Sequence, residues 1–437
     1  MFSLPVVNYM EETQTEKSTW LQRLKEQSWE AELLVSAIGT FASFQLFAVV
    51  KWLMFVMIDY LPPTQYFIGY IATYTGMLAV SMLTSMFILH FFLRFYWVGL
   101  VGLNSVFSET ESKNSAFSEI YTVKMLAILP KVKDSIHKVD DQCSVIFSIA
   151  FCLMVIYAYF AALLGLFIVF YNVLEPYLPH WLLIMPAVFV VTTAIVQALV
   201  SVIANLKRFH ADQRIQTLYF QVTRFQNWVF LGPFFTPVLQ ILMSFWSNFR
   251  NKKRLFLLQG GCFAIGLCSS VYFTVNSKVQ YFLEEDYFAD GTRVYTEFYA
   301  QNNAQAEFLI APEIQAEILR KPVTTLFIPV FRHENRVSQP LCEESLQFRE
   351  DASKREMKMA CYQYYHAVLL NGHAITPNFK RMNHPQTGQA GIFAYLDLSE
   401  ANAGDNMLTI RKELHAEDNM QWTIPFFLVD SNGFNGN

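Results

Sequence analysis

The sequence predicts an α-helical integral membrane bundle, with five transmembrane helices and a re-entrant or interfacial segment, followed by an all-β sandwich domain. Three observations lead to this fold class: five long apolar stretches, basic residues concentrated in alternate loops, and a change of composition near residue 278. Hydrophobic residues make up 53% of the 437 residues and charged residues only 16%. Soluble domains are about one quarter charged, so this composition indicates a chain that lies largely in lipid.

The transmembrane domain is expected at residues 31–278, with spans at residues 33–58, 65–92, 145–171, 181–204 and 255–275. Each span is long enough to cross a hydrocarbon core about 30 Å thick, which takes about 20 residues of helix. Residues 1–278 carry 19 basic and 15 acidic side chains, whereas residues 279–437 carry 13 and 21. The chain therefore changes at this boundary from a slightly basic membrane part to an acidic part of soluble composition.

The distribution of Lys and Arg predicts how the spans are threaded. The short links at residues 59–64 and 172–180 contain neither residue, whereas the links on the other side carry many, among them Lys131, Lys133 and Arg208. Short basic loops stay in the cytoplasm. We therefore expect a multi-pass protein of the plasma membrane, with a cytoplasmic N-terminus and a C-terminal domain outside the cytoplasm.

Two cytoplasmic elements are expected beside the first spans. Residues 1–30 are polar, and Thr13 and Glu16 have the spacing of a capping box ahead of Trp20. This pattern predicts a helix that lies on the cytoplasmic membrane surface. Residues 104–142 are expected to form a cytoplasmic helical hairpin that follows the membrane.

Residues 228–246 are apolar, but we do not expect them to cross. Arg224 precedes the segment and a basic cluster at residues 250–254 follows it, so a crossing would leave one basic group outside the cell. Pro233 and Pro237 interrupt its first half, as they do in re-entrant or interfacial segments. The alternative is a sixth crossing, which would place the C-terminal domain in the cytoplasm.

Residues 279–437 predict an extracytoplasmic β-sandwich. Candidate strands cover residues 325–331, 361–370, 392–398, 407–412 and 422–429. Asn371-Gly372 is a tight-turn dipeptide. Short strands separated by turn signals at these intervals are typical of a sandwich. Residues 313–320 are expected to form a helical turn within it.

A polar stripe in the fourth span is the sharpest membrane signal. Thr193, Gln197, Ser201 and Asn205 recur at i, i+4 spacing and therefore share one helix face. The functional interpretation is the lining of a pore or of a path for a small ligand. The structural interpretation is hydrogen bonding between helices, at roughly 0.6 kcal/mol per bond, and the sequence favours it.

Lys51 is the one charge well inside a span, and an ionisable group there is a functional candidate. A structural interpretation competes with this. Asp59 lies eight residues further on, about 12 Å along a helix, and a flexible Lys stem covers part of that distance by snorkelling. The sequence favours the structural interpretation here too.

The soluble part offers no catalytic or metal-binding pattern in its sequence. Cys342 and Cys361 are its two cysteines, and an exported domain would be expected to join them in a disulfide. The histidines lack metal-ligand spacing, and the oxygen-bearing side chains at residues 397–406 fit a solvated turn better than a Ca²⁺ loop. HExxH, GxSxG, P-loop and GxGxxG motifs do not occur. We expect no metal, no cofactor and no enzymatic activity.

Three short motifs resemble those of a bacterial family. They are residues 93–103 (LRFYWVGLVGL), residues 325–329 (TLFIP), and residues 369–372 (LLNG) followed by residues 404–406 (GDN). The layout of the chain and these motifs are similar to multi-pass bacterial membrane proteins that carry an exported β domain at the C-terminus and have no assigned activity. The resemblance implies the bacterial inner membrane and a periplasmic C-terminal domain. It implies no residue roles.

Two function classes follow. The first is a non-enzymatic sensor, anchor or assembly subunit, whose exported β-sandwich binds an envelope protein or glycan. The alternative is a passive channel or small-solute transporter that uses Lys51 and the polar face of the fourth span. The lipid bilayer is a partner in both cases, and an oligomer is compatible with both. Nucleic acid is not expected, because the basic residues are spread through juxtamembrane loops.

Overall fold

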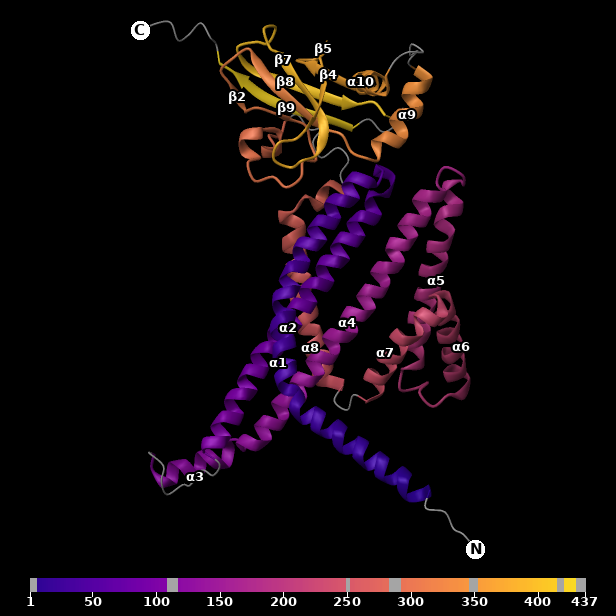
Figure 1. Ribbon diagram of the computed structural model, residues 1–437, viewed down its shortest axis with the longest axis vertical. Coiled ribbons are helices and arrows are strands. Elements are labelled where there is room, and N and C mark those ends of the chain that lie inside the picture. Colours follow the sequence, from indigo (N-terminus) through magenta and orange to yellow (C-terminus); the bar gives the residue numbers. More distant parts are fainter. Residues whose placement is uncertain are drawn as a thin grey trace. The chain divides into compact units, whose positions relative to one another are not determined.

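The computed structural model describes residues 6–107, 117–248, 252–282, 292–345, 353–414 and 420–429 (Figure 1). The chain divides into two compact units. Unit 1 comprises Met1–Ala48 and Gly76–Val271, and unit 2 comprises Val49–Thr75 and Tyr272–Asn437. Unit 2 therefore contains the predicted C-terminal domain together with the tip of the first helical hairpin.

The N-terminal half is helical, as predicted. Its helices are α1 (Val6–Tyr60), α2 (Tyr66–Val106), α3 (Glu119–Ile128), α4 (Val132–Leu174), α5 (His180–Ala204), α6 (Gln213–Val229), α7 (Thr236–Asn248) and α8 (Lys252–Asn276). Four described helices are long and apolar enough to cross a membrane: Leu33–Tyr60, Pro63–Val106, Glu119–Leu174 and His180–Ala204. They coincide with the first four predicted spans. The fifth predicted span falls on α8, where the apolar helix within the described residues is the shorter Gly260–Asn276.

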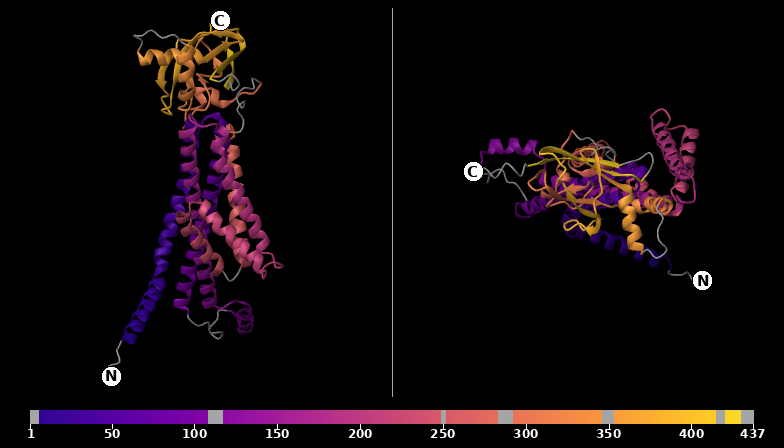
Figure 2. Two further views of the ribbon diagram at one scale, coloured as in Figure 1. Left: turned by 90° about the vertical axis from the view of Figure 1, so that its right-hand side faces the viewer. Right: turned by 90° about the horizontal axis from the view of Figure 1, so that it is seen from above.

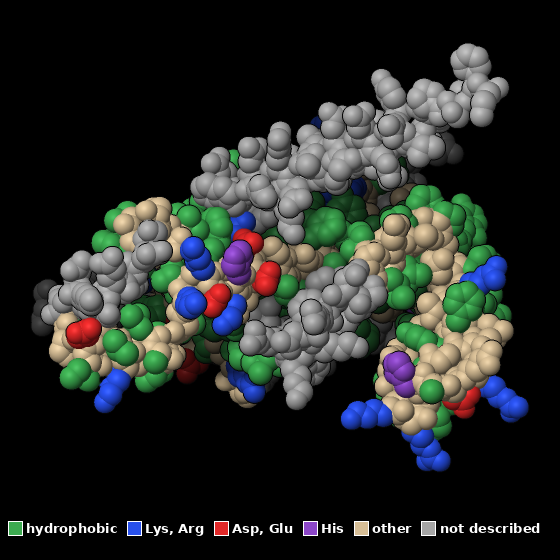
Figure 3. Space-filling model, turned by 90° about the horizontal axis from the view of Figure 1, so that it is seen from below, with side chains coloured by type: hydrophobic (Ala, Val, Ile, Leu, Met, Phe, Trp, Pro, Cys, Tyr) green, Lys and Arg blue, Asp and Glu red, His purple; other side chains and the backbone are tan. Residues whose placement is uncertain are grey.

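Helix α1 continues without a break from Val6 into the first span, so the predicted surface helix at residues 1–30 and that span form one 55-residue helix. The predicted hairpin at residues 104–142 corresponds to the end of α2, α3 and the start of α4, apart from residues 108–116, which lie outside the described residues. Basic side chains on the links around α3 and between α5 and α6 appear on the lower face of unit 1 (Figure 3).

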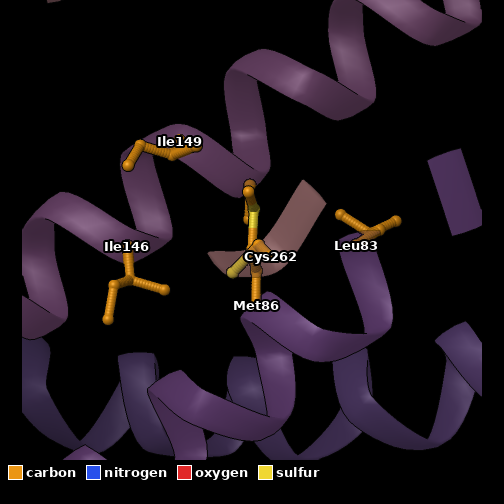
Figure 4. Close-up of a cluster of buried hydrophobic side chains, with 6 residues drawn as sticks. Leu83, Met86, Ile146, Ile149 and Cys262 are labelled. Atoms are coloured by element: carbon orange, nitrogen blue, oxygen red, sulfur yellow. The ribbon is translucent and has the colours of Figure 1, made fainter. Parts of the chain in front are cut away.

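Unit 1 is held together where α2, α4 and α8 meet. Its buried cluster consists of Leu83, Met86, Ile146, Ile149, Ala150 and Cys262 (Figure 4). The approach of α8 to α2 depends on Gly266, because a Cβ there would lie 2.7 Å from Met82 Cγ and 3.3 Å from the backbone oxygen of Leu78. Close backbone approach through a small residue is a usual way for helices to pack in lipid.

Helices α6 and α7 make a sharply bent pair, with 100° between Gln213–Val229 and Gly232–Ser244. The short helix η3 (Gly232–Phe234) lies at the bend, and Leu231 and Gly232 have positive φ values of 56° and 36°. Pro233 lacks a backbone N–H and does not continue α6. The geometry is that of a broken span or a re-entrant loop, and its first arm begins at Gln213, earlier than the predicted segment at residues 228–246.

The C-terminal region of unit 2 contains two β-sheets, as Figures 1 and 2 show. One sheet has the order β1 (Glu313–Ile314), β3 (Val323–Pro329), β7 (Ala390–Asp397), β6 (Lys380–Asn383). The other has the order β2 (Ile318–Leu319), β9 (Met420–Leu428), β8 (Gly404–Lys412), β4 (His366–Leu370), β5 (His373–Ile375). Neighbouring strands are antiparallel except β2 and β9, which are parallel.

The prediction that this region is all β was wrong. It also contains α9 (Glu334–Ser345) and α10 (Lys354–Tyr365), so residues 361–365 are helical where a strand was expected. A capping box between Ser353 and Glu356 starts α10 and fixes its direction. The expected helical turn at residues 313–320 is wrong as well, because strands β1 and β2 lie there.

Alternation of buried and exposed residues gives each main strand one core face. In β8 the even-numbered residues Leu408, Ile410 and Lys412 are buried, and in β9 Trp422 and Ile424 are buried opposite them. Successive strand residues point to opposite faces, so a shared face implies a shared core. Lys412 is the unexpected member of this set, because the other buried positions named on this face carry apolar side chains.

Candidate functional site

The tip of the first helical hairpin is joined to the segment that enters α9. The backbone oxygen of Asp59 accepts the His333 N–H at 3.0 Å. The Asp59 carboxylate accepts the Arg332 backbone N–H at 3.0 Å and lies 3.3 Å from Arg332 Nε. The Arg332 guanidinium lies 4.8 Å from the centre of the Tyr60 ring and donates to its hydroxyl. We call Asp59, Tyr60, Arg332 and His333 the hairpin joint.

A row of near-parallel rings crosses the same junction. Phe55 of α1 stacks on Phe308 with centroids 4.9 Å apart, Phe308 lies 6.1 Å from Phe331, and Phe331 lies 5.7 Å from His333. Tyr66 meets His333 edge-on at 6.4 Å. Aromatic pairs of this kind contribute about 0.5–1.5 kcal/mol each beyond the area that they bury. This ring stack makes the hairpin tip part of the core of unit 2.

A buried ion pair lies against the ring stack. Lys412 Nζ is 2.6 Å from Glu334 Oε1 and 2.7 Å from the Pro329 backbone oxygen. The two charged side chains are 0% and 1% exposed. The ammonium also lies 5.0 Å from the Phe331 ring centre and 5.5 Å from that of Trp422. A charge pair this deep persists only when hydrogen bonds satisfy its remaining atoms.

The Glu334 carboxylate is satisfied on both oxygens. Oε1 also accepts the Phe331 backbone N–H at 3.1 Å, and Oε2 accepts the Tyr365 hydroxyl at 3.3 Å. Burial raises the pKa of Tyr365 well above its ordinary value, and the Glu334 charge adds to the effect. Burial lowers the pKa of Lys412, although Glu334 opposes that shift. The arrangement is a buried and hydrogen-bonded pair rather than an exposed proton donor.

Two buried histidines flank the pair. His366 lies opposite Lys412 in the register of β4 and β8, and its Nδ1 is 2.7 Å from the Tyr362 oxygen. Its Nε2 is buried with no hydrogen-bond partner among the described residues. Burial and the Lys412 charge hold the pKa of His366 well below its ordinary value, and burial also lowers the pKa of His333. Both rings are therefore neutral at pH 7.

Three of the predicted stripe residues lie on α5 and Asn205 caps its C-terminus, and two of the four bond to α6. Gln197 Nε2 donates to Thr223 Oγ1 at 2.9 Å, and the Ser201 hydroxyl donates to the Tyr219 hydroxyl at 3.3 Å. The other two bond within α5. Thr193 donates to the Val190 oxygen at 2.9 Å and Asn205 to the Ser201 oxygen at 2.8 Å. These contacts are those of the structural interpretation, in which the stripe links helices.

Lys51 belongs to unit 2 rather than to the unit that contains α5. Its Nζ lies 2.9 Å from Glu307 Oε1, and the two side chains are 42% and 63% exposed. An exposed pair of this kind contributes about 0–1 kcal/mol. The side chain thus faces a carboxylate of the C-terminal region, as a snorkelling Lys near a helix end does.

Cys342 of α9 and Cys361 of α10 form a disulfide, with Cα atoms 5.5 Å apart. It borders a cavity of about 490 Å³ between the two helices, lined also by Ser338, Lys358 and Tyr362. The disulfide fastens α9, which begins at Glu334, to α10, which carries Tyr365. It therefore supports both helices that supply the buried ion pair with partners.

A second buried polar pair lies in the other sheet. His384 Nε2 is 2.9 Å from Glu313 Oε1, and both side chains are 5% exposed. Asn303 Nδ2 donates to the other Glu313 oxygen at 2.6 Å. The Thr387 hydroxyl and backbone N–H both face His384 Nδ1, at 3.2 and 3.3 Å. This row resembles a hydroxyl–imidazole–carboxylate triad, but His384 and Thr387 lie in the β6–β7 turn and Glu313 of β1 anchors that turn, and none of the three lines either cavity described here.

Sequence reasoning missed the hairpin joint and the buried ion pair. A signal existed for Lys412, because the alternation of β8 places it on the face of Leu408 and Ile410. None existed for Asp59 and Arg332, which are 273 residues apart. Among the described residues, no group of three or more His, Cys, Asp or Glu is placed to hold a metal ion.

No protein-family profile, curated protein or solved structure matches this chain significantly. The resemblance to the bacterial family therefore stays a prediction that rests on the layout of the chain and the short motifs.

Proposed function

We propose that this protein is a non-enzymatic membrane sensor or anchor of the bacterial inner membrane. Its helical part crosses the membrane five times from a cytoplasmic N-terminus, with the α6–α7 pair re-entrant. Its C-terminal β-sandwich, extended by α9 and α10, lies in the periplasm and binds an envelope partner. The observation that supports a sensor best is the hairpin joint, which makes the tip of α1 and α2 part of the compact unit that contains both sheets.

The joint gives this proposal its mechanism. A ligand that shifts the C-terminal region acts on Asp59 and Tyr60 through Arg332 and His333, because backbone and side-chain hydrogen bonds link the two pairs. The ring stack resists separation of the same surfaces. A change in the C-terminal region is thereby delivered to the ends of two transmembrane helices. Such coupling requires that the ligand binds more tightly to one of two arrangements of this junction than to the other.

Spin labels test whether the joint is rigid. Thr64→Cys at the hairpin tip and Gln339→Cys on α9 are both exposed, and each accepts a nitroxide in full-length protein without its free cysteines. We expect one narrow distance distribution in nanodiscs. Asp59→Ala should broaden it, because both Arg332 contacts and their alignment are lost. Glu307→Gln is the matched control, since it removes only an exposed ion pair. A broad distribution in the parent protein would contradict the proposal.

Labelling of intact cells tests the orientation. Gln386 is exposed on the turn between β6 and β7, so Gln386→Cys should react with a membrane-impermeant maleimide without lysis. Cys342 and Cys361 are paired and should stay silent. Reaction only after lysis would place the sheets in the cytoplasm and make α6–α7 a sixth crossing.

A passive solute path is the second candidate, supported by one observation on α6. Gln226 is 5% exposed, yet neither its amide nitrogen nor its oxygen has a hydrogen-bond partner among the described residues. It follows Tyr219 and Thr223 on the face that meets the α5 stripe. If this seam conducts, Gln226→Leu should reduce solute flux into proteoliposomes, whereas Gln221→Leu on an exposed position should not. Flux equal to that of empty liposomes would exclude this candidate.

A further inference from the structure

A groove of about 460 Å³ lies where β2, β8 and β9 meet at one end of the five-stranded sheet. Its floor comes from the outward face of the sheet. In the strand register, Phe427 of β9 lies opposite Asp405 of β8 on one side and Ile318 of β2 on the other. Directly paired side chains are about 5 Å apart. Carboxylate, aromatic ring and aliphatic side chain therefore form one row across three strands.

The apolar part of this row is open to solvent. Phe427 is 43% exposed and Ile318 is 58% exposed, and Val294 on the rim is 57% exposed. The opposite face of the same strands forms the core, so these exposed apolar side chains are not part of it. Adjacent exposed apolar side chains outside the membrane indicate a surface that meets another molecule.

The charge of the groove has one sign. Glu317 and Asp405 both line it, and no Lys or Arg is among its lining residues. Within the described residues, neither carboxylate forms an ion pair or accepts a hydrogen bond. Tyr299 also lines the groove. Burial and the charge of Glu317 raise the pKa of its hydroxyl to about 12.

The other polar groups of the groove are already committed. The Tyr299 hydroxyl donates to the Pro425 oxygen at 2.6 Å. Asn371 Nδ2 donates to Asn406 Oδ1 at 2.8 Å, and Asn371 Oδ1 accepts the Met407 N–H at 2.8 Å. The two carboxylates are thus the polar groups that remain for a ligand.

We propose that this groove binds a small organic cation, with an ammonium group on an apolar body. The ammonium lies between Glu317 and Asp405, and the apolar body packs on Phe427 and Ile318. The size falls within the range of small-molecule sites, about 300–1,000 Å³. A cation also gains from the face of an aromatic ring. A bare metal ion fits less well, because two carboxylates offer too few ligands and leave the apolar floor unused.

The inference deepens the proposed function, on which it rests, by naming the ligand class of the outer region. A chain of contacts leads from the groove to the hairpin joint. Strand β9 carries Phe427 in the groove and Trp422 against Lys412, and Lys412 bonds to Glu334 next to the joint. A bound cation therefore acts on the strand that supports the buried ion pair.

Calorimetric titration of the full-length protein in nanodiscs tests the groove, with 2-phenylethylammonium as the probe and 2-phenylethanol as its neutral match. We expect the cation to bind and the alcohol to bind about tenfold more weakly or not at all, with the difference reduced by salt. Asp405→Asn and Glu317→Gln should each weaken cation binding about two- to fivefold, as exposed ion pairs do. Asp397→Asn, a carboxylate at the end of β7 in the other sheet, should have no effect.

Equal binding of amine and alcohol, or amine binding unchanged by Asp405→Asn with Glu317→Gln, would overturn the inference. So would the absence of amine binding. These outcomes are separable from failure of the proposed function. If the hairpin joint is rigid and residue 386 is labelled from outside but no amine binds, only the groove inference fails. If the amine binds but the joint is flexible, only the sensor mechanism fails.

Discussion

Replacement of Lys412 by Met is the sharpest test of how unit 2 is held together. Met keeps the length and apolar stem of Lys but removes the ammonium that bonds to Glu334 and to the Pro329 oxygen. The Glu334 carboxylate is then left 1% exposed with only the Phe331 N–H and the Tyr365 hydroxyl as donors. A buried anion has lost its cation.

The magnitude follows from the burial of both partners. Removal of one member of a buried ion pair costs about 3–5 kcal/mol, because the remaining charge keeps its desolvation penalty. Each 1.36 kcal/mol changes an equilibrium about tenfold. If β8 and β4 open together, their amide protons should exchange about 160- to 5,000-fold faster in Lys412→Met. Arg411→Met on the same strand loses one exposed hydrogen bond, to Gln421, and should change exchange by less than about threefold.

Hydrogen exchange with mass spectrometry on the full-length protein in nanodiscs measures these exchange rates in peptides that cover β4 and β8. A second variant separates charge from packing. Lys412→Met with Glu334→Gln keeps an acceptor for the Phe331 N–H and removes the orphaned charge, so most of the lost protection should return. A single-variant effect below about 1 kcal/mol, or a double variant no better than the single one, would refute the reasoning.

Three further outcomes follow from the same contacts. His333 and His366 have lowered pKa values, so the folded state excludes protons that the unfolded chain takes up near pH 6.5. Stability should be full above that pH and fall below it by up to about 1.4 kcal/mol per pH unit for each ring, as melting temperatures at pH 5.5 and 7.5 will show. Reduction of the disulfide between α9 and α10, whose cysteines are 19 residues apart, should cost about 3 kcal/mol, measured as faster exchange in α10. Gly391→Ala should destabilise the β3–β7 pair by more than about 1 kcal/mol, because its Cβ would lie 2.6 Å from the Ile328 oxygen. Gly165→Ala, with nothing within 4 Å, is the matched control.

The helices could be predicted because lipid imposes one rule on every span. Backbone groups in hydrocarbon must be bonded within the segment, so a long apolar stretch already implies a helix. The first four spans followed from this alone. The bend between α6 and α7 was also readable, since Pro233 lies in the break and Pro237 in the first turn of α7, where a missing N–H is tolerated.

The soluble region was predicted less well because its signals compete. Strands β3, β7, β8 and β9 were found within a few residues, and β7 and β8 alternate clearly. Residues 361–365 contain aromatic residues that favour strands, yet the capping box at Ser353 commits them to α10. Strand β2 has two residues and exists because β9 pairs with it. Nothing in so short a segment reveals its partner.

The polar stripe on α5 shows why a correct pattern leaves function open. The spacing placed Thr193, Gln197, Ser201 and Asn205 on one face, and the structure has them there. A face does not specify what lies against it. Helix α6 supplies Thr223 and Tyr219, so two of the four side chains bond across an interface. The spacing alone therefore does not separate a helix contact from the lining of a path.

One segment contacts both the hairpin tip and the sheets of unit 2. Residues 331–334 contact the hairpin tip through Arg332 and His333, and the sheets through Phe331 and Glu334. Four consecutive residues that serve both sides cannot shift on one side alone without loss of contacts on the other. Glu334 is held by Lys412, whose ammonium faces Trp422 on β9. We propose that occupancy of the groove at the far end of β9 reaches the α1–α2 tip through this chain of contacts, which Lys412→Met and Asp59→Ala each interrupt.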